Sequence, residues 1–163
     1  MTLQGQLRAG TPVMVQGATG HTARRHMALM REHGTHIVAG VSPGRDGETV
    51  DGVTIYSTCA AAVAATGAAI AIQFVPARQV AEAAREALES GIKLLVTVAE
   101  GVPVHDSARI MRLARTLGVS WVGPSTPGIA VPGVLKLGFM PDVSLSRGPV
   151  SYTHLTLPPS DLV

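Results

Sequence analysis

The sequence has 163 residues, which is enough for one domain with a buried core. Hydrophobic residues make up 46% of it and aromatic residues only 3%, so aliphatic side chains must build the core, which favours helices on a parallel sheet. The net charge of +2, without interleaved aromatics, argues against a nucleic-acid partner. The single cysteine excludes an intrachain disulfide and fits a cytoplasmic location, and no apolar run is long enough for a membrane span.

Apolar runs alternate with segments of helical periodicity from the start of the chain to about residue 122. The predicted strands, in chain order, cover residues 12–16, 36–41, 53–56, 68–75, 92–98 and 119–122. The predicted helices cover residues 21–33, 58–66, 78–90 and a further segment that ends at 117, and a glycine ends each one. This repeated β-α-β order predicts an α/β fold with a doubly wound parallel sheet, which is a Rossmann-like domain.

The composition changes at Gly123, where proline and glycine become frequent. This stretch predicts an irregular segment, either an ordered loop beside the ligand or a linker to a second domain. Residues 151–163 continue none of the earlier patterns and resemble a translated sequencing adapter. The predicted domain is therefore 1–150, followed by a non-native tail, with a genuine flexible terminus as the alternative.

The turn between the first strand and the first helix is a candidate phosphate site. It contains Gly17, Thr19 and Gly20. Glycines there let backbone N–H groups approach a phosphate, and the helix N-terminus adds about half a positive charge. A tight turn also needs glycine for steric reasons alone, so this pattern is only a partial indication.

The loop after the second strand contains Ser42, Pro43 and Arg45. An NAD-binding domain prefers an acidic residue at this point, and the sequence has none at the end of the strand. Arginine suits a phosphate instead, such as the 3′-phosphate of coenzyme A or the 2′-phosphate of NADP. A solvated loop arginine is the alternative interpretation.

Two further loops follow buried strands and face the same crevice. Glu100 can accept a hydrogen bond from a ligand amide or adenine, or it can instead favour the N-terminus of the next helix. Val75 and Pro76 can form a wall for adenine or pantetheine, although Pro76 also serves simply to end its strand. His21, His26, His33 and His36 show no paired spacing with acids or cysteines that is typical of a metal site, and Cys59 is predicted to be a small buried residue.

Six segments taken together resemble the α subunit of succinyl-CoA synthetase and its relatives, the malate-CoA and ADP-forming acyl-CoA synthetases. The segments are QGATG (16–20), GVSPGR (40–45), FVP (74–76), AEGVP (99–103), GPSTPG (123–128) and KLGFMP (136–141). The resemblance implies coenzyme A as the ligand and gives contact roles to the first turn, to Arg45 and to residues 98–100. The residues predicted to bind coenzyme A are Gly17, Thr19, Gly20, His21, Thr22, Ser42, Pro43, Arg45, Val75, Pro76, Val98, Ala99, Glu100 and Ser125.

The same resemblance implies the function of the larger enzyme. In this family of the tricarboxylic acid cycle, a nucleoside triphosphate activates a carboxylic acid through a phosphohistidine, and coenzyme A then takes the acyl group. The histidine belongs to a second domain, which would begin where residues 151–163 stand, and a β subunit supplies the nucleotide site. We therefore expect a non-catalytic, coenzyme A-binding part of an acid–CoA ligase, with no catalytic residue of its own.

Two alternatives remain open at this stage. The spacing Gly17-x-x-Gly20-x-x-Ala23 resembles the glycine turn of short-chain reductases and allows an NAD(P)-binding oxidoreductase domain. The missing acidic residue after the second strand and the absence of a Tyr-x-x-x-Lys pair count against it. A stand-alone coenzyme A-binding module without catalysis is the other alternative.

Overall fold

A computed structural model describes residues 6–140 and contains a seven-stranded sheet in the order β3-β4-β2-β1-β5-β6-β7. All neighbouring strands pair in parallel except β3, which pairs antiparallel with β4 at the edge. The strands are β1 (Pro12–Gln16), β2 (His36–Val41), β3 (Thr49–Val50), β4 (Val53–Tyr56), β5 (Ile70–Gln73), β6 (Leu94–Thr97) and β7 (Ser120–Val122). The parallel strands follow the Rossmann order, with the winding reversed between β1 and β5, which confirms the predicted fold class.

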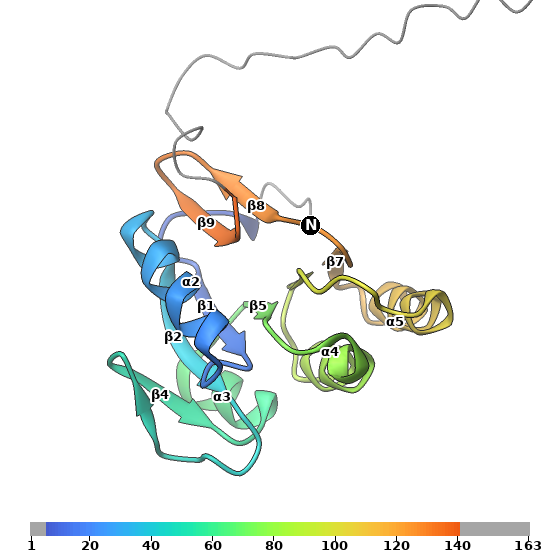
Figure 1. The fold of residues 1–163 in the computed structure, drawn as a ribbon, viewed down its shortest axis with the longest axis horizontal. Helices are drawn as coiled ribbons and strands as arrows, with labels where there is room; N and C mark the ends of the chain where they lie inside the picture. The colour runs from blue at the N-terminus through green and yellow to red at the C-terminus, as the bar shows by residue number, and fades with distance from the viewer. Residues whose placement is uncertain (1–5, 141–163) are drawn as a thin grey trace, which may run out of the picture.

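The sheet is covered on both faces (Figure 1). Helix α2 (His21–Glu32) lies on one face, and α3 (Cys59–Thr66), α4 (Val80–Glu89) and α5 (Val104–Leu117) lie on the other, with the short 3-10 helix η1 (Ala77–Gln79) leading into α4. Alternate residues of one strand therefore enter different cores. Val13 and Val15 pack with Met27 of α2, while Met14 packs with Leu88 of α4.

Glycines end α3 and α5, as the sequence predicted, and a threonine caps the start of α3. The Thr58 side chain accepts a hydrogen bond from the Ala61 N–H at 3.2 Å and so caps α3. Gly67 and Gly118 end α3 and α5 in the left-handed conformation, at φ 69° and 67°. The strands β5 and β6 are shorter than the apolar runs that predicted them, because hydrogen-bonded pairing covers only the centre of each run.

The segment from Gly123, predicted to be irregular, is ordered beside the groove and contains two short strands that the sequence did not predict. Residues Gly128–Val131 (β8) and Leu135–Gly138 (β9) form an antiparallel hairpin that packs beside α2 (Figure 1). Leu135 and Leu137 are buried in the same core as α2. Prolines and glycines are frequent here and usually indicate loops. The two short strands between them were therefore not recognised from the sequence.

A buried hydroxyl attaches the hairpin to the sheet. The Thr35 Oγ1 atom donates to the Lys136 carbonyl at 2.6 Å and accepts from the Lys136 N–H at 3.0 Å. Residues 141–150 of the predicted domain and the predicted tail 151–163 lie outside the described residues. Within residues 6–140, no helix combines the length and the apolar character that crossing a bilayer requires.

Candidate ligand-binding site

The carboxyl ends of β1 and β5 lie side by side where the winding of the sheet reverses. The chain leaves β1 towards α2 on one face and leaves β5 towards α4 on the other, which opens a crevice between them. Two adjacent pockets occupy this edge, with volumes of about 580 and 560 Å³. Both are lined by Phe74, Val75 and Pro76, so the two pockets form the halves of one groove.

We call the larger half the β1 pocket. Its walls come from the turn after β1, the loop after β2 and the start of α4. Its lining residues are Gln16, Gly17, Thr19, Gly20, Val41, Ser42, Pro43, Arg45, Phe74, Val75, Pro76, Arg78, Gln79, Glu82, Ala83 and Glu86.

The turn after β1 requires glycine at its first position. Gly17 has φ 74°, and a Cβ atom there would lie 2.5 Å from the Phe74 carbonyl oxygen. Gly20 then begins α2 without any side-chain cap, and the first turn of this helix carries no acidic residue. The positive end of α2 therefore faces the β1 pocket without a side-chain anion of its own, an arrangement suited to a phosphate.

Two hydroxyls and one guanidinium complete this side of the pocket. The Thr19 and Ser42 side-chain oxygens are 3.0 Å apart, and the bond joins the turn after β1 to the loop after β2. The Arg45 guanidinium contacts Glu48 at 3.2 Å, with side chains 52% and 49% exposed. Such an exposed pair contributes only about 0.2–1 kcal/mol, so Glu48 competes weakly with a ligand phosphate for Arg45.

We call the other half the β6 pocket. Its walls come from the loop after β6, the segment before β8, and residues on α2 and after β5 and β9. Its lining residues are Thr22, Phe74, Val75, Pro76, Val98, Ala99, Glu100, Ser125, Thr126, Pro127 and Phe139. The Ser125 N–H donates to the Ala99 carbonyl at 2.9 Å, which holds the two loops together. Glu100 is exposed, and its side chain makes no hydrogen bond or ion pair with the described residues.

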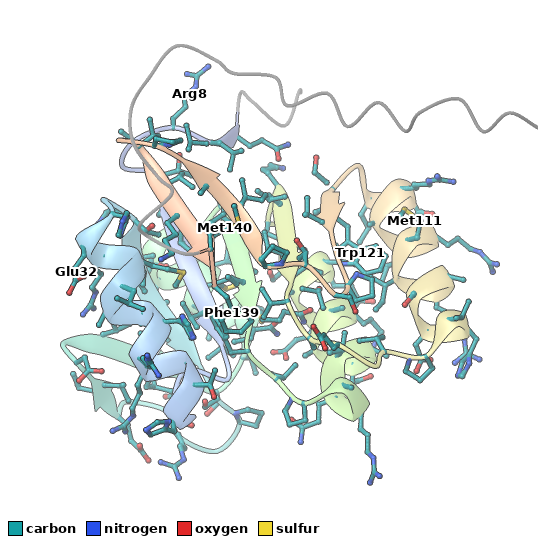
Figure 2. All side chains as sticks on the ribbon, turned by 45° about the horizontal axis from the view of Figure 1, so that its top comes forward. Arg8, Glu32, Met111, Trp121, Phe139 and Met140 are labelled. Carbon is teal, nitrogen blue, oxygen red and sulfur yellow. The ribbon has the colours of Figure 1, made fainter. Side chains whose placement is uncertain are left out.

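Three rings pack together beneath the β6 pocket. Phe74 and Phe139 line the pocket, and their ring centroids are 5.4 Å apart. His26 of α2 stacks on Phe74 at 5.8 Å and meets Phe139 edge-on at 4.4 Å. Figure 2 shows Phe139 just after β9, between α2 and the central strands. The hairpin therefore contributes directly to a pocket wall.

A chain of buried side-chain hydrogen bonds crosses the sheet behind the groove. The Trp121 indole N–H donates to Thr97 Oγ1 at 3.0 Å, and the Thr97 hydroxyl donates to the Gln73 amide oxygen at 2.6 Å. The Gln73 amide donates to the Gln16 amide oxygen at 2.8 Å, and the Gln16 amide donates to Cys59 Sγ at 3.1 Å. Every donor points the same way, from β7 towards β1 and α3.

This chain ends at α3 and α4. The Gln16 amide also donates to the Ala83 carbonyl of α4 at 2.9 Å, and the Cys59 N–H donates to the Glu86 carboxylate at 2.7 Å. Burial, together with the Glu86 carboxylate, raises the pKa of Cys59 to about 12. Cys59 has no solvent exposure, which confirms the prediction of a small buried residue, and its raised pKa keeps the thiol protonated at neutral pH.

All the predicted site residues except His21 line one or the other half of the groove. His21 is the exposed first residue of α2 and lines neither half. Sequence reasoning missed Arg78 of η1, Glu86 of α4 and Phe139, which directly follows the hairpin. The helical periodicity of α4 could have indicated which of its residues face the crevice. Among residues 6–140, no group of three His, Cys, Asp or Glu side chains could hold a metal ion.

Comparison with known families identifies the domain. The family described as "CoA binding domain" matches residues 9–101. The chain belongs to this CoA binding domain family. The matched residues include the turn after β1, the loop after β2 and the loop after β6 up to Gly101, and coenzyme A is the cofactor that the sequence led us to expect.

The CoA binding domain is similar to those of succinate–CoA ligases. It is 43% identical over 131 residues to succinate–CoA ligase [ADP-forming] subunit alpha 2 of Archaeoglobus fulgidus, covering 80% of this chain and 46% of the relative. It is 41% identical over 142 residues to the alpha subunit of Aquifex aeolicus, covering 86% of this chain and 47% of the relative. The chain thus spans about half the length of the curated relatives it matches.

Solved structures agree on the fold. ATP citrate lyase of Methanothrix soehngenii, solved in complex with citrate and coenzyme A, superposes with a TM-score of 0.71 at 25% identity, covering 81% of this chain and 23% of that one. D-galactose-1-dehydrogenase of Rhizobium etli superposes with a TM-score of 0.58 at 24% identity, covering 69% of this chain and 36% of that one, and this likeness concerns the fold alone.

Proposed function

We propose that the groove binds one molecule of coenzyme A along its whole length. The observation that carries this proposal is that two adjacent pockets share the wall formed by Phe74, Val75 and Pro76. Each half has a volume suited to part of a large cofactor, and coenzyme A is a long ligand with two chemically different ends. The β1 pocket takes the phosphorylated adenosine end, and the β6 pocket takes the pantetheine end.

The polar groups of the β1 pocket match the phosphates. The uncapped N-terminus of α2 and the hydroxyls of Thr19 and Ser42 donate to oxyanions of the ligand. Arg45 lies on the loop after β2, lines this half, and contacts the 3′-phosphate of the adenosine. The charge on Arg45 thus distinguishes coenzyme A from ligands that lack this phosphate.

The β6 pocket has the character that pantetheine requires. Its walls are largely apolar, with Val75, Val98 and Phe139 among them. The Glu100 carboxylate is exposed at the same pocket and accepts from an amide N–H of the pantetheine arm. The reactive thiol of coenzyme A then lies towards the β6 end of the groove.

We propose further that this domain serves an acid–CoA ligase of the succinate–CoA ligase type, together with a β subunit. The similarity to the two alpha subunits supports this assignment. Neither half of the groove is lined by a histidine, so residues 6–140 supply the binding of coenzyme A, and phosphoryl transfer belongs to other parts of such an enzyme. We propose that the 163-residue chain by itself does not catalyse the reaction.

Calorimetric titration of the 163-residue chain with coenzyme A, dephospho-coenzyme A and NADPH tests the ligand. We expect coenzyme A to bind, and dephospho-coenzyme A to bind about tenfold more weakly, since the charge-assisted bond to Arg45 is lost. Arg45→Ala should remove that difference. Arg112→Ala, on the exposed face of α5 away from both pockets, is the matched control. Binding of NADPH without binding of coenzyme A would overturn the proposal.

A further inference from the structure

A second arginine lines the β1 pocket from the opposite wall. Arg78 lies in η1, between the end of β5 and the start of α4, and its side chain is exposed at the pocket. Arg45 and Arg78 are the two arginines among the residues that line this half. They come from elements on either side of the reversal point, because Arg45 follows β2 and Arg78 follows β5.

The surroundings of Arg78 do not neutralise its charge. The residue precedes α4, where the positive end of the helix disfavours a cation. Glu82 lies one turn later, but its carboxylate contacts Arg85, which lowers the pKa of Glu82. Within the described part of the chain, Arg78 makes no ion pair or side-chain hydrogen bond, so its guanidinium is available to an anion.

The groove between α4 and α5 offers Arg78 no better partner. Arg78 also borders this groove, together with Asp106. The Asp106 carboxylate lies 3.5 Å from the Arg109 guanidinium and 3.4 Å from the His105 ring. The two acidic residues that line this groove, Glu82 and Asp106, thus both contact other cations.

The order of groups within coenzyme A determines which phosphate Arg78 can reach. The pyrophosphate joins the adenosine to pantetheine, so it must lie where the two halves of the groove meet. Pro76 lines both halves, and Arg78 follows it by two residues. Arg45 and Arg78 both line the β1 pocket and not the β6 pocket, but Arg45 follows β2, which β1 separates from β5 in the sheet. The geometry therefore points to different phosphates for the two arginines.

We infer that Arg78 is a second phosphate-binding residue of the groove and that it contacts the pyrophosphate, while Arg45 contacts the 3′-phosphate. This inference rests on the proposed binding of coenzyme A. The pyrophosphate then lies between Arg78 and the N-terminus of α2, where it meets positive charge from two sides.

Coenzyme A and dephospho-coenzyme A differ only in the 3′-phosphate, so a comparison of their affinities distinguishes the role of Arg78 from that of Arg45. Coenzyme A and dephospho-coenzyme A are titrated into the full chain and into Arg78→Ala, Arg78→Lys, Arg45→Ala and Arg112→Ala. Arg78→Ala should weaken both ligands by the same factor, about tenfold, because both carry the pyrophosphate. Arg78→Lys should restore part of this loss, since lysine keeps the charge but not the fork geometry. Arg45→Ala should weaken coenzyme A alone, and Arg112→Ala should change neither.

Two results would overturn the inference while leaving the proposed function in place. If Arg78→Ala bound both ligands like the unchanged chain, Arg78 would contact no phosphate. If it weakened coenzyme A but not dephospho-coenzyme A, Arg78 would contact the 3′-phosphate instead of the pyrophosphate. Circular dichroism melting of each variant establishes that it is folded. Failure of the unchanged chain to bind coenzyme A would overturn the proposed function, and the inference with it.

Discussion

Cys59, which lies behind the groove, is fixed in place by its burial and by two hydrogen bonds. Cys59 has no solvent exposure, accepts from the Gln16 amide, and its N–H donates to Glu86. The thiol thus acts as a small acceptor behind Gln16 and Glu86, which line the β1 pocket. A thiolate there would lack solvent and would face a carboxylate, which is why the pKa of Cys59 lies so high.

We expect Cys59 to react very slowly with a thiol-directed reagent in the folded chain. The rise of its pKa from 9.0 to about 12 reduces the thiolate fraction at pH 8 by about a thousandfold, and burial slows access further. The measurement is the rate of labelling at pH 8, with the same chain in concentrated guanidinium chloride as the control. Similar rates in the two conditions would contradict this description of the site.

The same shift has a consequence for stability at alkaline pH. Between pH 9 and about 12 the folded state retains a proton that the unfolded state has lost. The contribution of Cys59 is therefore fully present below pH 9 and is lost as the pH rises through this window.

At the scale of secondary structure, the β8–β9 hairpin adds to the groove a wall that the strands and helices of the Rossmann-like sheet do not provide. It packs beside α2 through Leu135 and Leu137 and provides Phe139 to the β6 pocket. Its attachment depends on Thr35, which is 4% exposed and satisfies both backbone polar groups of Lys136. The hairpin thus depends on a residue 101 positions earlier in the chain.

Replacing Thr35 by valine should destabilise the fold by about 2 kcal/mol or more. Valine preserves the shape but leaves the N–H and carbonyl groups of Lys136 without their buried partner. Urea unfolding gives the free energy of unfolding, and Thr54→Val, at an exposed position of β4, is the matched control. A loss within the range of the control variant would show that the hydroxyl does not hold the hairpin.

At the scale of the whole molecule, the described residues form one binding surface along a single edge of the sheet. Most of the site lies where β1, β2, β5 and β6 end, and residues of α2, of α4, of the segment before β8 and Phe139 after β9 complete it. Under the proposed function such a domain positions the thiol of coenzyme A, and no histidine lines the described groove that could carry the phosphoryl group.

The isolated chain should therefore form no acyl-coenzyme A. The assay incubates it with succinate, coenzyme A, Mg²⁺ and either ATP or GTP, and follows thioester formation by absorbance. A parallel titration with coenzyme A shows that the same preparation binds its ligand. Thioester formation that depends on both the acid and the nucleotide would refute the proposed non-catalytic role.

Sequence patterns predicted the sheet and most of the groove for one physical reason. In a doubly wound sheet, loops that follow strands meet at the same edge, so Gly17, Arg45 and Glu100 could be assigned to one crevice without coordinates. The hairpin and the Trp121–Gln16 hydrogen-bond chain could not be predicted, because they depend on contacts between residues far apart in the sequence. Arg78 was missed because an exposed arginine on a helix is usually solvated.

Trp121, whose indole N–H donates to Thr97, is also a natural fluorescent probe. Trp121 is the sole tryptophan in the sequence, and its indole begins the chain of donors that crosses the carboxyl edge of the sheet. The residue after Thr97 is Val98, which lines the β6 pocket. Intrinsic fluorescence at a single wavelength therefore reports on the integrity of this edge, and the urea experiments described above need no added label.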